Sequence, residues 1–176
     1  MIEKTQPENK KMLRLFAVLA VAVVGNTANA ESVPITGNVS SKCSIYTSVA
    51  GVYGNPTPDS LDTDPTSGGV DPVVRFDVTA ADYYIAKISW PNSFASAPSL
   101  DDALAWDGEV TVSQTSDTLM SGYEAAKVEY DNVTEYDLTV AGSTWFQIES
   151  SVDYGYGKSF PGGEYAANVV AECIAS

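Results

Sequence analysis

The feature that most constrains the fold of this chain is an alternation of apolar and polar side chains with a period of two residues. In residues 73–79, Val74, Phe76 and Val78 alternate with Arg75 and Asp77. Such alternation predicts a strand with one buried face. Similar runs predict further strands at 32–40, 83–90, 110–113, 126–130, 136–140, 146–150 and 164–174.

The segments between these runs are rich in Gly, Pro, Asn, Asp and Ser, which favour turns. The best helix candidate is a turn or two at 100–105, with Ser99 as its cap. Short strands at this spacing, without helices between them, predict an all-β fold, an immunoglobulin-like antiparallel β-sandwich. A closed barrel is the alternative.

The segment 50–72 interrupts the strand pattern with prolines, glycines and aspartates. We expect an exposed loop, either mobile or folded back as an irregular cover. Within it, Asp62 and Asp64 resemble the opening of a calcium-binding loop, but Val73 stands where a bidentate Glu is required. They are therefore a weak calcium candidate, and an acidic solvated loop is the alternative.

Residues 1–30 have the pattern of a secretory signal peptide. Lysines and an arginine precede an apolar run from Leu15 to Val24, and Ala28-Asn29-Ala30 matches a cleavage site. The run is shorter than the roughly 20 residues of a membrane span, although an N-terminal anchor is the alternative. We therefore expect secretion through the inner membrane, no membrane contact in the mature form, an extension at 31–41 and a folded domain at 42–176.

Composition excludes several function classes. From Glu31 onward the chain has five Lys and Arg against 21 Asp and Glu, a net charge of −16, which argues against nucleic-acid partners. The chain has no histidine, so catalysis by a Ser-His-Asp or Cys-His arrangement is excluded. No phosphate-binding or dinucleotide motif is present, and we expect neither an enzyme nor a cofactor.

Two cysteines, Cys43 and Cys173, remain in the secreted part of the chain. Outside the cytoplasm such a pair predicts a disulfide, and two buried free thiols are the alternative. Because the closed loop would span about 130 residues, the bridge would stabilise the fold by roughly 4–5 kcal/mol.

The predicted strands at the two ends of the mature chain differ from each other. The first, 32–40, is short and ends before Cys43, whereas the last, 164–174, has no strand after it. A sandwich of this type normally has one more closing strand. The expected fold therefore lacks an edge strand, and its open edge invites a strand from another chain.

The C-terminal pattern resembles that of chaperone–usher pilins, the major subunits of fimbriae. The run from Pro161-Gly162-Gly163 through Tyr165 to Val169 is similar to the family's final strand, and the N-terminal alternating stretch fits as well. This resemblance implies a fibre subunit that serves adhesion or biofilm formation. The acceptor groove would involve the last-strand residues Gly163, Tyr165, Ala167, Val169 and Ala171.

The resemblance also implies the partners and the mechanism. A periplasmic chaperone and an outer-membrane usher would assist assembly into a homopolymer on the cell surface. The donor-strand residues Val33, Ile35, Gly37 and Val39 of one subunit would then fill the groove of its neighbour. Whether this segment acts in trans or within its own chain stays open at this stage.

The same pattern constrains the disulfide. Strands on either side of a vacant position lie about 9–10 Å apart, whereas a disulfide needs Cα atoms within roughly 7 Å. The bridge must therefore lie beyond the end of the groove, or the strands must pinch together there.

The alternative function is that of a self-complete secreted β-sandwich that binds glycan or a cell-surface partner. The residues that would suit sugar stacking are Trp90, Trp106 and Trp145, although core filling explains such residues equally well.

Overall fold

The structure is a computed structural model that describes residues 34–36, 42–80 and 84–176. The chain divides into two units, Met1–Asn38 and Val39–Ser176. In the first unit, residues 34–36 have no regular secondary structure, and the Ile35 side chain is 97% exposed. The rest of the strand predicted at 32–40, including Val33, Gly37 and Val39, lies outside the described residues.

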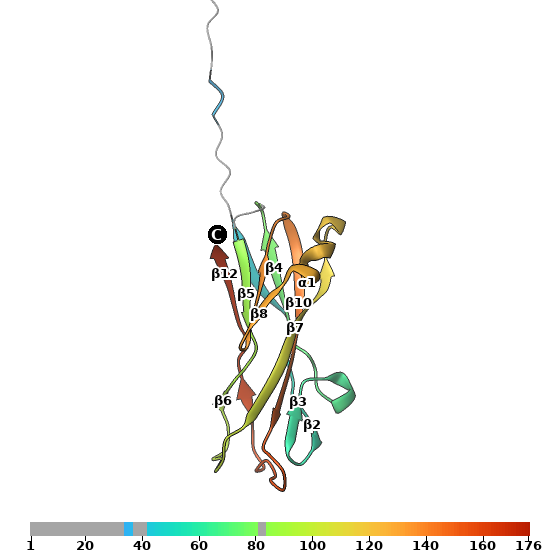
Figure 1. Cartoon of the computed structure of the whole chain (residues 1–176), viewed down its shortest axis with the longest axis vertical. Coiled ribbons are helices and arrows are strands. Elements are labelled where there is room, and N and C mark those ends of the chain that lie inside the picture. Colours follow the sequence, from blue (N-terminus) through green and yellow to red (C-terminus); the bar gives the residue numbers. More distant parts are fainter. Residues whose placement is uncertain (1–33, 37–41, 81–83) are drawn as a thin grey trace, which may run out of the picture. The chain divides into compact units, whose positions relative to one another are not determined.

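The second unit consists mainly of strands (Figure 1). In chain order these are β1 (Cys43–Val49), β2 (Gly54–Thr57), β3 (Ser60–Asp62), β4 (Val73–Val78), β5 (Tyr84–Ser89), β6 (Phe94–Ser96), β7 (Ala105–Thr115), β8 (Val128–Tyr130), β9 (Val133–Asp137), β10 (Gly142–Asp153), β11 (Ala166–Ala167) and β12 (Val170–Ala175). The helical elements are the 3-10 turns η1 (Pro65–Ser67) and η2 (Thr118–Gly122) and the short helix α1 (Tyr123–Ala126). In the described ranges, no helix is long and apolar enough to cross a membrane.

All strand pairs are antiparallel, and they form two main sheets. The first sheet has the order β1-β4-β10-β3-β2, and β7 pairs along the other edge of β10. The second sheet has the order β12-β5-β9-β8, and β11 pairs separately with β6. The all-β prediction is therefore confirmed, with β1 and β12 each at the edge of a different sheet.

The core lies between the two sheets. Phe76 on β4 and Phe146 on β10 are fully buried, with ring centroids 5.5 Å apart in an edge-to-face arrangement. From the other sheet, Ile88 on β5 and Tyr136 on β9 pack into the same cluster. The Tyr136 hydroxyl donates a hydrogen bond of 2.8 Å to the carbonyl oxygen of Val110 on β7. This bond satisfies a buried polar group and ties one sheet to the other.

The segment 50–72, predicted as an exposed irregular loop, contains the hairpin of β2 and β3. Leu61 is only 6% exposed, and β3 pairs with the end of β10. A buried polar network orders the segment: the Thr63 hydroxyl donates to Asp71, which also accepts from the Gln147 amide. The prediction of irregular structure was wrong for β2, β3 and η1, because these hydrogen bonds supply order that the apolar pattern does not reveal. The prediction of exposure holds at residues 55–58.

The helix predicted at 100–105 is also absent, since residues 99–104 have no helical structure. The described helix lies instead at α1, where Tyr123 is buried and its hydroxyl accepts a hydrogen bond from the backbone N–H of Val140. α1 has no side-chain cap of its own, so the packing of Tyr123 holds it in place.

Candidate functional site: an open groove between two strand edges

One wall of the candidate site is formed by β1. This strand pairs with β4 on one edge and has no ladder partner on the other among the described residues. Ile45 lies opposite the buried Phe76, and Thr47 lies opposite the buried Val74, so both face the core side of the sheet. Ile45 is nevertheless 36% exposed, and Thr47 and Val49 are exposed as well. The core-facing side of β1 is therefore left uncovered.

The opposite wall is formed by β11 and the residues around it, and β12 continues from this wall toward the disulfide. Tyr165, Ala167, Val169, Ala171 and Cys173 are half-buried, and the residues between them are exposed. β12 pairs with β5 and β11 pairs with β6, each along one edge only within the described part of the chain. This wall therefore also presents unpaired backbone groups.

Between the two walls lies a groove with a volume of about 740 Å³. Its floor includes Leu61 and Val74, which are core residues exposed by only 6% and 8%. Its other lining residues come mainly from the end of β1 and the loop after it, and from 160–169. The groove thus reaches down to residues of the hydrophobic core.

A cluster of aromatic side chains forms one end of the groove. Phe160 and Tyr165 line it with ring centroids 5.3 Å apart, and Phe94 lies 5.2 Å from Tyr165. The Tyr165 hydroxyl donates a hydrogen bond of 2.6 Å to the carbonyl oxygen of Pro161. The Tyr53 ring packs edge-to-face on Phe94, with centroids 6.4 Å apart. The Tyr53 hydroxyl is within 3.0 Å of the Ser150 hydroxyl, and burial raises the pKa of Tyr53. These contacts fix the 160–165 loop and the rim of the groove.

The disulfide closes the other end of the groove. Cys43 and Cys173 are bonded, with Cα atoms 6.4 Å apart, so the predicted disulfide is confirmed. Neither cysteine lines the groove, whose lining begins at Thr47 on β1 and ends at Val169 before β12. The two strand edges therefore pinch together at the bridge and separate beyond it.

The groove gathers most of the site residues that the sequence predicted for the last strand. Gly163, Tyr165, Ala167 and Val169 line it, whereas Ala171 packs against the core nearer the disulfide. The opposite wall, with Thr47 and Val49, was not predicted. The alternation of Ile45, Thr47 and Val49 with Tyr46 and Ser48 is the signal that could have revealed it.

The calcium candidates Asp62 and Asp64 have local hydrogen-bond partners. The Asp62 carboxylate accepts the backbone N–H of Asp64 at 2.8 Å, and Asp64 accepts the backbone N–H of Thr66, which caps η1. Hydrogen bonds from Thr66 lower the pKa of Asp64. Across residues 34–36, 42–80 and 84–176, no group of three or more acidic, Cys or His side chains has the geometry to hold a metal ion.

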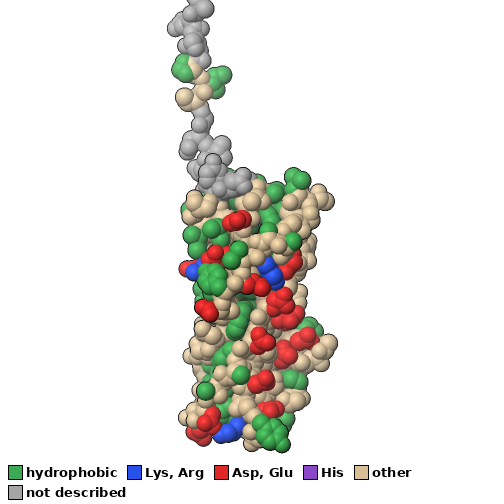
Figure 2. Space-filling model, in the orientation of Figure 1, with side chains coloured by type: hydrophobic (Ala, Val, Ile, Leu, Met, Phe, Trp, Pro, Cys, Tyr) green, Lys and Arg blue, Asp and Glu red, His purple; other side chains and the backbone are tan. Residues whose placement is uncertain are grey.

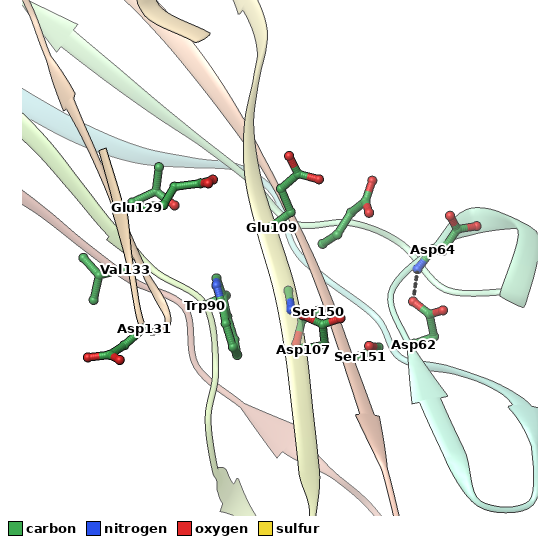
Figure 3. A pocket seen from close by; sticks show the side chains of 13 residues that line it. Asp62, Asp64, Trp90, Asp107, Glu109, Glu129, Asp131, Val133, Ser150 and Ser151 are labelled. Atoms are coloured by element: carbon green, nitrogen blue, oxygen red, sulfur yellow. Dashed lines mark hydrogen bonds between the residues drawn. The ribbon is translucent and has the colours of Figure 1, made fainter. Parts of the chain in front are cut away.

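A second cavity, of about 430 Å³, lies on a different part of the surface and is lined mainly by acidic residues. Figure 3 shows Trp90 among these carboxylates, and Figure 2 shows acidic side chains gathered along one face. Burial, and then the nearby carboxylates of Asp71 and Glu109, raise the pKa of Glu149 in this cavity. The cavity thus attracts positive charge. It lies beside the edge strands β7 and β8, but its lining is acidic, unlike that of the groove.

The three tryptophans considered for sugar stacking lie in different surroundings. Trp90 lines the acidic cavity, and Trp106 packs on Phe94 with ring centroids 4.7 Å apart. Trp145 lies on the outer side of the first sheet, where the Arg75 guanidinium is 5.7 Å from its ring centroid. They therefore do not form one shared platform.

Comparison of the chain with protein-family models, with curated proteins and with solved structures gives no match in any of the three. The functional argument therefore depends on the groove itself.

Proposed function

We propose that this chain is the structural subunit of an extracellular surface fibre, in which residues 31–40 of one copy fill the groove of the next. The observation that carries the proposal is the open groove whose floor consists of the core residues Leu61 and Val74. Unpaired strand edges on both walls invite an added strand, which would complete the sheets and cover the core in one step.

The arrangement of the two sheets supports the same proposal. We infer an immunoglobulin-like sandwich that lacks one strand, with the vacant position between β1 and β12. The support is that these two strands are the edges of different sheets, that the disulfide links them, and that a groove opens past their contact, between the end of β1 and residues 160–169. An inserted strand would lie beside residues 160–169 and cover the end of β1.

The chain itself carries a segment with the chemistry of the missing strand. Val33, Ile35, Gly37 and Val39 alternate with polar residues and proline, so one face of 31–40 is apolar or small. The Ile35 side chain is 97% exposed in the single chain, so its burial in a groove would remove nearly all of its apolar surface from water and stabilise the complex accordingly. A neighbouring copy is therefore the occupant that this sequence favours.

The wider pathway follows from the resemblance to chaperone–usher pilins. In that pathway, a signal peptide directs the chain across the inner membrane, and a periplasmic chaperone fills the groove until an outer-membrane usher exchanges subunits. The completed fibre would be extracellular and would serve adhesion or biofilm formation. We propose no catalytic step and no cofactor for this function.

Mobility on denaturing gels without boiling tests the proposal, because strand-exchanged subunits dissociate slowly and run as a ladder. Asp substitutions at the inward positions (V33D/I35D/V39D) should abolish the ladder, since they would bury three charges in an apolar groove. The matched control S32D/T36D/N38D adds the same charge to the other face and should keep the ladder.

A second pair of variants tests the groove from its own side. Thr47 lines the groove and the adjacent Ser48 does not, although both are exposed on β1. T47R should therefore prevent polymerisation, while S48R should permit it. Equal ladders from T47R and S48R, or from V33D/I35D/V39D and S32D/T36D/N38D, would show that the groove does not hold residues 31–40.

A further inference from the structure

The disulfide lies at the end of the groove where the chain enters the folded unit. Cys43 is the first residue of β1, and Lys42 precedes it directly. The Lys42 backbone N–H donates to the Thr79 hydroxyl, and the Lys42 carbonyl accepts from the Thr79 N–H, both at 3.1 Å. Lys42 therefore continues the pairing of β1 with β4 and does not turn back toward the groove.

This arrangement matters for whether residues 31–41, called the arm below, can occupy the groove of their own chain. To do so by the shortest route, the arm would turn at 41–42 and run back beside β1, between β1 and β12. Its backbone would then pass level with Cys43 and Cys173. An inserted strand needs about 9–10 Å between its neighbours, whereas the Cα atoms of these cysteines are 6.4 Å apart and joined by the bridge. This route is therefore closed.

A detour around the bridge would leave too little of the arm. The groove lining begins at Thr47, five residues beyond Lys42, or roughly 16 Å along a strand. An arm returning from Lys42 would use residues 37–41 to cover that distance even without a detour. Gly37 and Val39 would then lie outside the groove.

We propose that the Cys43–Cys173 disulfide excludes the arm from its own groove and so reserves the groove for the arm of a second copy. This inference rests on the proposed function and adds how self-occupancy is prevented. An arm from a second copy enters from the end of the groove opposite the bridge and has no bridge to cross. Its tip would stop where β1 and β12 come together ahead of the disulfide, which fixes how far it inserts.

The test measures how fast a fluorescent peptide of residues 31–40 binds the oxidised chain beginning at Glu31, at nanomolar chain concentration where subunits do not exchange. The wild type is compared with V33D/I35D/V39D, whose charged arm does not compete for an apolar groove. We expect equal association rates, within about twofold, because the bridged chain leaves its own groove empty. An arm that did reach its groove would compete at millimolar effective concentration and slow binding by about tenfold or more.

Two changes should restore self-competition. The first is C43A/C173A, which opens the direct route, and the second is an insertion of about eight Gly and Ser residues after Ser41, which makes the detour long enough. In each background, the intact arm should slow peptide binding about tenfold or more relative to the charged arm. Because both arms are compared within one background, any loss of stability cancels.

The outcomes separate the inference from the function on which it rests. Slower binding to the bridged wild type than to its charged-arm partner would overturn the inference, and so would unchanged rates in the insertion pair. If C43A/C173A does not refold, the bridged pair and the insertion pair decide. Failure of the peptide to bind even the charged-arm chain would overturn the proposed function itself.

Discussion

Truncation of Ile35 provides the most direct measure of what the groove contributes to binding. The side chain is 97% exposed in the single chain, so its docking in a neighbour's groove would remove nearly all of it from water. Ile35→Ala deletes three carbon atoms, each contributing about 0.8 kcal/mol when buried, or about 2.4 kcal/mol in total. A peptide of residues 31–40 with this change should therefore dissociate about 50-fold faster.

Stopped-flow or competition measurements of the labelled peptide on the V33D/I35D/V39D chain provide the assay. Thr36→Ala is the matched control, because position 36 alternates with position 35 and would face outward. We expect its dissociation rate to stay within about threefold of the wild type. Comparable rates for the I35A and T36A peptides would refute the two-residue alternation on which the docking geometry depends.

The remaining predictions concern stability. C43A/C173A should lower the free energy of unfolding by roughly 5 kcal/mol, because the bridge closes a loop with a sequence separation of 130; in urea melts, a loss below about 1 kcal/mol would contradict this. E149Q should raise the melting temperature at pH 7. The pKa of Glu149 is raised in the folded state, so its carboxyl group contributes stability below the unfolded pKa of about 4.3, and this stability is lost as the pH rises through the folded pKa. Gln does not ionise and avoids that loss. The advantage of E149Q should therefore vanish in melts near pH 3.5, and an equal gain at both pH values would exclude the titration as its cause. Gly69→Ala should destabilise the β2–β3 hairpin by about 2 kcal/mol or more, since its Cβ would lie 2.4 Å from the Asp62 carbonyl oxygen; hydrogen exchange of the hairpin amides reports the change, and unaltered protection would contradict it.

The strands β4 and β5 could be predicted from the sequence because their buried positions are apolar and most of their outward positions are polar. β10 was predicted only at 146–150, although it spans Gly142–Asp153. Thr144 is 2% exposed and lies in the part that was not predicted, where a buried polar residue hides the alternation; Ser150 is equally buried within the predicted part. Their hydroxyls are instead satisfied by Met120 and Tyr53, partners that are distant in sequence.

The candidate site was predictable on one wall only. The pattern at 164–174 located Tyr165, Ala167 and Val169, which do line the groove. The floor residue Leu61 was not predicted, because it is a single apolar residue within a segment rich in turn formers. Its burial depends on the pairing of β3 with β10, a long-range contact that no local pattern encodes.

The exposure of core residues at the bottom of the groove links binding to folding thermodynamics. Leu61 and Val74 belong to the interior of the unit, yet they also form the surface that a docked segment would touch. Any molecule that occupies the groove of the native state and not the unfolded chain must raise the midpoint of thermal denaturation as its concentration increases. A simple thermal shift scan of this chain can therefore rank candidate occupants without any label.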